Sequence, residues 1–341
     1  MKKHRVVLLA LAAIAAVLVA SIGAAASGTA SAAGKKQFSA CLVTDIGGLN
    51  DKSFNHLAYV GLQKAQTTAQ VKGRVIQSKS SQDYIPNLSA CVRSGAGITV
   101  GVGFLMADAM DAVASKFPKS KFAIVDVDVT SLKHKPKNVQ GLLFKEQEAG
   151  YLVGYMAGLY AKSKNITAVS SVGGIKLPPV DRYIAGFQYG AKKADPGIQT
   201  LNGYSQDFVD QAKCKEVALD QIAQGSGVVF QVAGQCGLGA LDAAKEKNAF
   251  GIGVDADQFY LGAHMMTSAL KRVDVAVFSA ITAAQNNGLK TGINAIYDAK
   301  KNGVAFGKVS PRIPASIKTK VNAQLKLLKA GKIKGIPQSV K

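Results

Sequence analysis

Short, continuously apolar runs alternate with amphipathic helical runs along almost the whole chain, and this alternation constrains the fold more than any other feature. Strands that are apolar throughout are typical of a parallel sheet covered by helices on both faces, because neither face meets water. A second series of such units begins near Val139, so the sequence predicts an α/β fold of two doubly wound lobes. The apolar runs are 38–45, 74–78, 98–103, 122–127, 166–172, 199–204, 228–233 and 251–254, and the helical runs are 53–65, 85–94, 107–117, 148–161, 181–194, 210–223 and 239–247.

The N-terminal residues have the pattern of an export signal. A basic stretch at residues 2–5 precedes an apolar run of about 15 residues, which suits a signal-peptide core and is short for a membrane-spanning helix. Ala30-Ser31-Ala32 predicts cleavage after Ala32, so 1–32 is expected to be a signal peptide, with a retained N-terminal anchor as the alternative. No lipobox is found, since Cys41 lies inside the first expected strand. We therefore expect an exported, extracytoplasmic protein, in the cell envelope or secreted.

The net charge is strongly basic. It is formally +21, and +18 remains after removal of the three cations of the signal peptide. A nucleic-acid-binding protein would cluster its Lys and Arg with aromatic residues between them. Here the cations are spread along the chain, with a mild excess in the last third. We expect a solvated cationic surface that could also rest on anionic envelope polymers, and no nucleic-acid partner.

Four cysteines remain in the mature chain, at Cys41, Cys91, Cys214 and Cys236. An even number in an exported protein indicates disulfides, although spacing alone leaves three connectivities open. We favour Cys41–Cys91 and Cys214–Cys236, because each pair would lie within one predicted lobe; free buried thiols are the alternative. Without a C-x-x-C motif or a histidine partner, a zinc site is not expected.

One helical run carries glycines at regular spacing. Gly150, Gly154 and Gly158 recur every four residues in the run around 149–161, which places them on one helix face. This arrangement favours close packing against a neighbouring helix over membrane insertion.

Glycines and carboxylates cluster where the expected strands end. In open α/β sheets ligands bind at the carboxyl ends of strands, glycines let the backbone approach a ligand closely, and carboxylates accept from hydroxyl or amino donors. The sequence therefore predicts a small-molecule site in a cleft between the lobes. These segments are 45–48, 101–104, Asp126, 173–174, 233–234 and 255–257.

Enzymatic motifs are missing from the sequence. A dinucleotide site needs G-x-G-x-x-G at the first strand-to-helix turn, and residues 45–50 lack it, while 101–106 supply only its first half. No G-x-S-x-G nucleophile elbow or metal-ligand cluster is found. We therefore expect no catalysis, no cofactor and no metal.

The sequence also resembles a known family. Residues 43–55, VTDIGGLNDKSFN, closely resemble the signature of the basic membrane protein family, which are ABC-transporter substrate-binding proteins whose best-known members are purine nucleoside receptors. The resemblance continues in collinear order over essentially the whole mature chain. The further matching segments are 101–104, 122–126, 144–148, 232–234, 237–239, 243–247, 252–258, 267–274 and 331–334.

The resemblance implies a type I periplasmic-binding-protein fold, with two Rossmann-like lobes joined by hinge crossovers. We expect an N-terminal lobe of 37–142 plus about 265–305 and a C-terminal lobe of 143–264 plus about 306–341. The implied protein is the extracytoplasmic solute-binding component of an ABC importer, a monomer that binds a purine nucleoside by hinge closure and docks on a membrane permease. A surface sensor or receptor that presents ligand with the same clamp, or a binder of a non-nucleoside solute, is the alternative.

The resemblance also implies roles for individual residues. Similar proteins hold a purine between two aromatic rings, here Phe54 and Phe208, and anchor its ribose through an Asp and a Lys, here Asp255 and Lys271. Each has an alternative role: core packing for Phe54, core or surface packing for Phe208, a helix N-cap for Asp255 and a surface position for Lys271. The full expected ligand-binding set is Asp45, Asn50, Asp51, Phe54, Asp126, Phe208, Gly234, Asp255 and Lys271.

Two segments depart from the family pattern. Cys236 occupies a loop where members commonly carry a small or hydroxyl residue, and a bond to Cys214 would stiffen one wall of the cleft. Residues 176–180, KLPPV, are also particular to this chain. Either departure could change the ligand while leaving the fold intact.

Overall fold

A computed structural model describes residues 37–340 of the chain. The predicted signal peptide, 1–32, and its cleavage after Ala32 lie outside the described residues. Within the described part, no helix has both the length and the apolar character needed to cross a bilayer.

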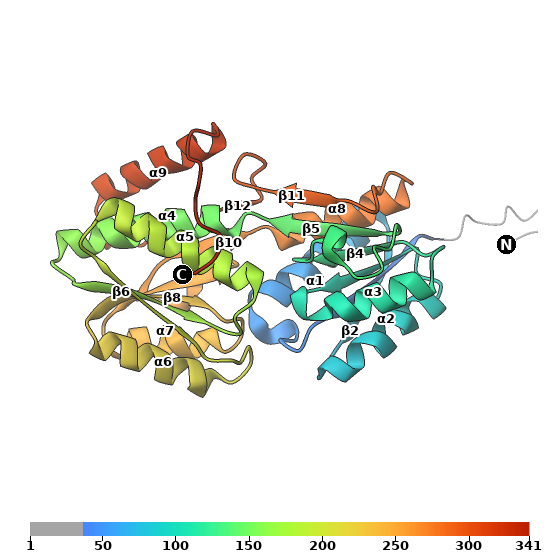
Figure 1. Ribbon diagram of the computed structural model, residues 1–341, viewed down its shortest axis with the longest axis horizontal. Coiled ribbons are helices and arrows are strands. Elements are labelled where there is room, and N and C mark those ends of the chain that lie inside the picture. Colours follow the sequence, from blue (N-terminus) through green and yellow to red (C-terminus); the bar gives the residue numbers. More distant parts are fainter. Residues whose placement is uncertain (1–36, 341) are drawn as a thin grey trace, which may run out of the picture. The chain divides into compact units, whose positions relative to one another are not determined.

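Two six-stranded sheets form the framework of the described chain (Figure 1). The first has the order β11-β5-β4-β3-β1-β2 and is parallel throughout, and the second has the order β12-β10-β9-β8-β6-β7, in which only β12 is antiparallel. The predicted α/β class is therefore confirmed. The strands are β1 Ser39–Thr44, β2 Lys72–Gln77, β3 Ile98–Val102, β4 Phe122–Val125, β5 Val139–Phe144, β6 Ala168–Gly173, β7 Gln199–Tyr204, β8 Ser226–Val232, β9 Phe250–Asp255, β10 Met265–Lys271, β11 Asn294–Tyr297 and β12 Val304–Phe306.

Helices cover both faces of each sheet, which explains why the central strands are apolar on both sides. In β1, Ala40 and Leu42 belong to one apolar cluster, and the alternate residues Cys41 and Val43 belong to another on the opposite face. The helices of the first sheet are α1 Phe54–Ala69, α2 Tyr84–Arg93, α3 Ala107–Lys116 and α8 Val273–Gln285, and those of the second are α4 Glu146–Ser163, α5 Pro178–Ala194, α6 Gln211–Ala223, α7 Gly237–Glu246 and α9 Ala315–Lys329.

The chain passes between the sheets three times within the described residues. These crossovers lie between β5 and α4, between β10 and α8, and between β11 and β12. We call the part built on the first sheet lobe 1, residues 37–144 and 273–297, and the part built on the second sheet lobe 2, residues 146–271 and 304–340.

One expected lobe boundary is wrong, and the second series of strands and helices begins later than predicted. Residues 139–144 form β5, which pairs with β4 of lobe 1, and the second series begins with α4 at Glu146. Residues 265–271 were expected in the N-terminal lobe, but they form β10, which pairs with β9 in lobe 2. The second crossover therefore follows Lys271. Strand pairing is non-local, so the hydrophobic pattern of a strand does not reveal which sheet it joins.

The glycine-bearing helix packs as its spacing predicts. A side chain on Gly154 of α4 would place its Cβ 2.1 Å from the carbonyl oxygen of Phe187 on α5, and one on Gly150 would lie equally close to that of Tyr183. From the other side, a Cβ on Gly190 of α5 would lie 2.2 Å from the carbonyl oxygen of Tyr151. The two helices therefore touch backbone to backbone.

The structure contains the disulfides Cys41–Cys91 and Cys214–Cys236, the pairing that the sequence favours. The first joins β1 to α2 in lobe 1. The second joins α6 to the residue before α7 in lobe 2.

Candidate functional site

A cavity lies between the two lobes at the carboxyl ends of their central strands. Its empty space, including open solvent at its mouth, is about 620 Å³. Strand exits of both sheets contribute to it, as expected for open α/β sheets. The lining residues are Asp45, Gly47, Asp51, Phe54, Asn55, Gly103, Phe104, Leu105, Asp126, Leu177, Pro179, Val180, Tyr183, Phe208, Val232, Gly234, Val254, Asp255 and Lys271.

All but one of the residues expected to bind ligand line this cavity. The exception is Asn50, which is exposed and is not part of the lining. Its neighbour Asp51 turns inward instead and is buried. Asn50 is therefore removed from the candidate set.

Asp51 organises the start of α1. Its Oδ1 accepts from the backbone N–H groups of Ser53 and His56, at 3.0 and 3.1 Å, and its Oδ2 accepts from that of Asn55 at 2.7 Å. These are N–H groups that no helical carbonyl can satisfy, and a carboxylate suits the positive end of the helix. Asp51 therefore holds the beginning of α1, and with it Phe54, at the cavity wall.

Asp45 faces the cavity from the end of β1. Its Oδ1 accepts from the backbone N–H of Gly47 at 2.9 Å and from the Asn55 side-chain amide at 2.7 Å. Gly103 has a φ of +109°, and a Cβ there would lie 2.7 Å from Asp45 Oδ2. Glycine is thus needed at position 103 both for the backbone conformation and for room beside the carboxylate.

Lys271 lies in a buried ion cluster at the centre of the site. Its Nζ donates to Asp126 Oδ2 at 2.7 Å and lies 3.1 Å from Glu146 Oε1. Glu146 also accepts from Arg182 Nε at 2.6 Å. The alternative surface position for Lys271 is thereby excluded, since its side chain is only 2% exposed.

Aromatic rings surround the same ammonium group. The Nζ of Lys271 lies 5.0 Å from the ring centroids of Phe54 and Phe144 and 5.9 Å from that of Tyr183. Cation–π attraction in a desolvated setting stabilises the charge. Phe54 is therefore a partly buried wall residue that contacts both the cavity and the ion cluster.

Asp255 joins the two lobes. Its Oδ1 accepts from the Tyr183 hydroxyl of lobe 2 at 3.0 Å, and its Oδ2 lies 3.1 Å from the Ser53 hydroxyl of lobe 1. The same Ser53 hydroxyl lies 2.9 Å from the carbonyl oxygen of Val254. The alternative role of Asp255 as a helix N-cap is not what the structure shows.

Burial raises the pKa of three cavity carboxyls. Desolvation is the largest cause for Asp45, Asp126 and Asp255, and brings each pKa to about 6 from 3.8. For Lys271, burial lowers the pKa, but the neighbouring carboxylates, Asp126 first among them, raise it further, so the pKa lies above its usual value. The lysine therefore stays charged while the three carboxyls titrate not far below neutral pH.

Two of these carboxyls sit on strained backbone. Asp126 and Asp255 have φ values of 70° and 59°, in the left-handed region. Aspartate adopts this region more readily than most side chains, and the conformation costs some free energy at each strand exit.

Phe208 forms part of the lobe 2 wall. It lies in the loop between β7 and α6, and a Cβ on Gly174 would lie 2.4 Å from its ring. Gly234, with a φ of +56°, lies beside its carbonyl oxygen. The glycines predicted at the two strand exits thus make room for an aromatic ring.

Several site residues were missed from the sequence. Tyr183 and Arg182 lie inside helix α5, away from the strand exits, and Glu146 follows the exit of β5, which the sequence analysis does not single out. Glu146 is part of a segment matched to the family, 144–148, but no role was assigned to it. Glu146 is completely buried in the first turn of α4. A buried charge would have marked it as a site residue, but burial is a property of the folded chain.

The fold and the interlobe cavity describe a solute-binding protein of an ABC transporter. A crystal structure described as that of ABC transporter system solute-binding proteins from Aeropyrum pernix K1 has a TM-score of 0.79 to this chain at 27% identity, and covers 89% of this chain and 94% of its own.

The family is narrower than this class. The family model described as "ABC transporter substrate-binding protein PnrA-like" (Bmp) matches residues 38–337, and the chain belongs to this family. It is therefore a substrate-binding protein rather than an enzyme, as predicted, and the family implies a small-molecule ligand and a permease partner.

Named relatives are similar over most of their length. The "CD4+ T-cell-stimulating antigen" of Listeria monocytogenes is 33% identical over 321 residues, covering 88% of each chain. The "ABC transporter nucleoside-binding protein BmpA" of Lactococcus lactis is 32% identical over 330 residues, covering 90% of this chain and 92% of its own.

Proposed function

We propose that this protein works outside the cytoplasm, where it binds a purine nucleoside in the interlobe cavity and delivers it to an ABC permease in the membrane. The nucleoside-binding relative from Lactococcus lactis supports the ligand class. So does the lining, in which aromatic rings from both lobes combine with several buried carboxylates.

The base binds between rings contributed by the two lobes. Phe54 comes from α1 of lobe 1 and Phe208 from lobe 2, and both line the cavity. Stacking of a heteroaromatic base contributes about 1–3 kcal/mol per ring, and every purine offers such a face. The rings therefore favour the class of base without selecting one member of it.

The observation that carries the proposal is an unsatisfied acceptor. Asp126 Oδ1 is buried in the cavity wall and has no hydrogen-bond partner among the described residues, whereas its Oδ2 is paired with Lys271. Leaving such an atom without a partner costs about 1–3 kcal/mol or more. A ribose hydroxyl would donate to this oxygen and remove that cost, and the hydrogen bond would be charge-assisted.

Binding proceeds by closure of the lobes around the ligand. Three polar contacts already join the lobes at the cavity: Asp126 with Lys271, and the Ser53 hydroxyl with Val254 and with Asp255. A ligand that contacts both walls adds to these and stabilises the closed form by its differential affinity. The closed monomer is the form that docks on the permease. X-ray scattering should show a smaller radius of gyration when nucleoside is added.

Calorimetry with adenosine, guanosine and inosine tests the ligand and the site together. Phe54→Ala and Asp255→Ala should each weaken nucleoside binding by at least ~1–2 kcal/mol. The matched control is Phe38→Ala, because Phe38 is also partly buried but packs against Gly97, away from the cavity. It should lower thermal stability and leave the affinity unchanged.

The proposed ligand is abandoned if no nucleoside raises the melting temperature of the wild type while an unrelated solute does. The site assignment is abandoned if nucleosides bind and both cavity variants keep the wild-type affinity. Mass spectrometry of ligand carried through purification identifies the bound molecule independently of either result.

A further inference from the structure

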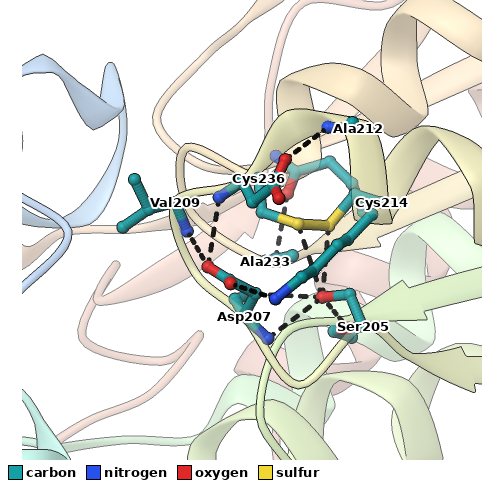
Figure 2. The surroundings of a disulfide bond; sticks show 11 residues. Ser205, Asp207, Val209, Ala212, Cys214, Ala233 and Cys236 are labelled. Atoms are coloured by element: carbon teal, nitrogen blue, oxygen red, sulfur yellow. Dashed lines mark hydrogen bonds and ion pairs between the residues drawn. A yellow bond between two sulfur atoms is a disulfide. The ribbon is translucent and has the colours of Figure 1, made fainter.

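The Cys214–Cys236 disulfide lies directly behind the part of the cavity wall that carries Phe208. Both cysteines are completely buried, Cys214 in α6 and Cys236 immediately before α7. Figure 2 shows the disulfide beside Ser205 and Asp207, which belong to the loop that connects β7 to α6. We call this segment, residues 205–210, the Phe208 loop.

The disulfide contacts the Phe208 loop at both of its sulfurs. The Ser205 hydroxyl lies 3.3 Å from Cys214 Sγ and 3.4 Å from Cys236 Sγ. The backbone N–H of Cys236 donates to the carbonyl oxygen of Phe208 at 3.0 Å. The residue that forms one half of the bond therefore also holds the backbone of the ligand-facing aromatic residue.

The rest of the Phe208 loop is tied to α6. Asp207 Oδ2 accepts from Lys213 of α6 at 2.8 Å, and its Oδ1 accepts from the N–H of Val209 at 2.8 Å inside the loop. Asp210 caps α6 by accepting from the N–H of Ala212 at 2.9 Å. The position of the loop thus depends on how α6 stands relative to the first residues of α7, and this is the relation that the disulfide fixes.

The ring of Phe208 is packed tightly against the backbone of its neighbours. A Cβ on Gly174 would lie 2.4 Å from the ring and 3.0 Å from the carbonyl oxygen of Asp207, so ring and loop rest directly on the backbone at the end of β6. A displacement of the loop by a fraction of an ångström would therefore change the shape of the cavity.

We propose that the Cys214–Cys236 disulfide is a positioning device for ligand binding, which holds the Phe208 loop in its binding-competent position. This inference rests on the proposed function, in which Phe208 stacks on the ligand. The bond orders the loop before ligand arrives, so binding does not have to bear the entropy of ordering it. Because both sulfurs are buried, exchange with an external thiol requires local opening, and the bond acts as a permanent brace.

The experiment compares the two disulfides of the same chain. The variant Cys214→Ala/Cys236→Ala should weaken nucleoside binding about three- to tenfold, the range expected when one side chain and its loop must be ordered on binding. The control Cys41→Ala/Cys91→Ala removes the bond in lobe 1, whose cysteines do not line the cavity. Both variants should melt at a lower temperature than the wild type, but only the first should lose affinity.

A double-mutant cycle separates positioning from general loss of structure. Phe208→Ala should weaken binding in the wild type and weaken it much less in the Cys214→Ala/Cys236→Ala background, because the ring is no longer held in place there. If the two effects are additive, or if removal of the disulfide leaves the affinity unchanged, the proposal is wrong. Should the double variant not fold, Ser205→Ala tests the same contact with the disulfide intact, and an unchanged affinity overturns the proposal.

An error in the proposed ligand can be told apart from an error in the proposed role of the disulfide. If wild-type protein binds no nucleoside, the proposed function fails, and amide hydrogen exchange then tests the brace without any ligand. The N–H groups of Val209 and Asp210 should exchange faster in the Cys214→Ala/Cys236→Ala variant than in wild type, and at the wild-type rate in the lobe 1 control. Equal rates in all three proteins would overturn the inference.

Discussion

Asp45→Asn should make the unliganded protein more stable at neutral pH although it removes a charge from the candidate ligand site. Burial raises the pKa of the Asp45 carboxyl from 3.8 to about 6. Below the lower value the carboxyl is protonated in both folded and unfolded chains, so it contributes no pH dependence. As the pH rises from 3.8 to about 6, the carboxyl ionises first in the unfolded chain. The folded state therefore loses stability until the carboxyl is ionised in the folded chain as well.

The size of the loss follows from the two pKa values. At about 1.4 kcal/mol per pH unit, the difference between 3.8 and about 6 corresponds to about 3 kcal/mol at pH 7.5 and about 1 kcal/mol at pH 4.5. Asparagine keeps an oxygen to accept from Gly47 and Asn55. The free energy of unfolding of the variant, relative to that of wild type, should therefore rise by about 2 kcal/mol between pH 4.5 and pH 7.5.

Urea unfolding of unliganded protein at several pH values measures this gain. Asp83→Asn is the matched control, because the backbone N–H of Lys79 hydrogen-bonds to the exposed Asp83 carboxylate and lowers its pKa. Its linkage has the opposite sign, so that variant should lose stability relative to wild type as the pH rises. Parallel stability curves for wild type and Asp45→Asn between pH 4.5 and pH 7.5 would refute the reasoning.

Three further predictions concern charge and packing. Lys271→Met should destabilise the protein by about 3–5 kcal/mol in urea unfolding, since it leaves the buried carboxylate of Asp126 without its cation and Glu146 with Arg182 alone. Gly154→Ala should cost about 1–3 kcal/mol or more, because its Cβ would collide with the backbone of α5, whereas Gly197→Ala, whose Cβ meets nothing closer than 4.0 Å, should be nearly neutral. Adenosine 5′-monophosphate should bind at least about tenfold more weakly than adenosine in calorimetry, since the carboxylates at the cavity outnumber the cations and would repel a phosphate.

The sequence predicts the fold class because each strand's apolar pattern is a local property. The strand 250–255 and the helix 211–223 lie within two residues of their predicted ends. The predicted lobe for residues 265–271 is wrong because the lobe of a strand depends on its pairing, here with β9. The sequence analysis predicts no helix at 315–329, where the structure has α9. Its apolar residues form only a narrow buried stripe among lysines.

The candidate site was predictable where ligand-facing residues follow strands. Asp45, Asp126 and Asp255 each lie at such an exit and line the cavity. The ion cluster was not predictable, since Lys271 meets Asp126 across 145 residues of sequence and joins Glu146 from a third element. Only the folded chain shows that these charges compensate one another.

The backbone contact between α4 and α5 bears on how the protein moves. With no side chains between them at the glycines, these helices have almost no freedom to slide or tilt, and lobe 2 should travel as a single block. Any rotation that admits or releases ligand must then be absorbed by φ and ψ changes in the three short connections between the lobes. Stiffening those connections should slow ligand exchange, while the helix pair itself transmits the motion without deforming.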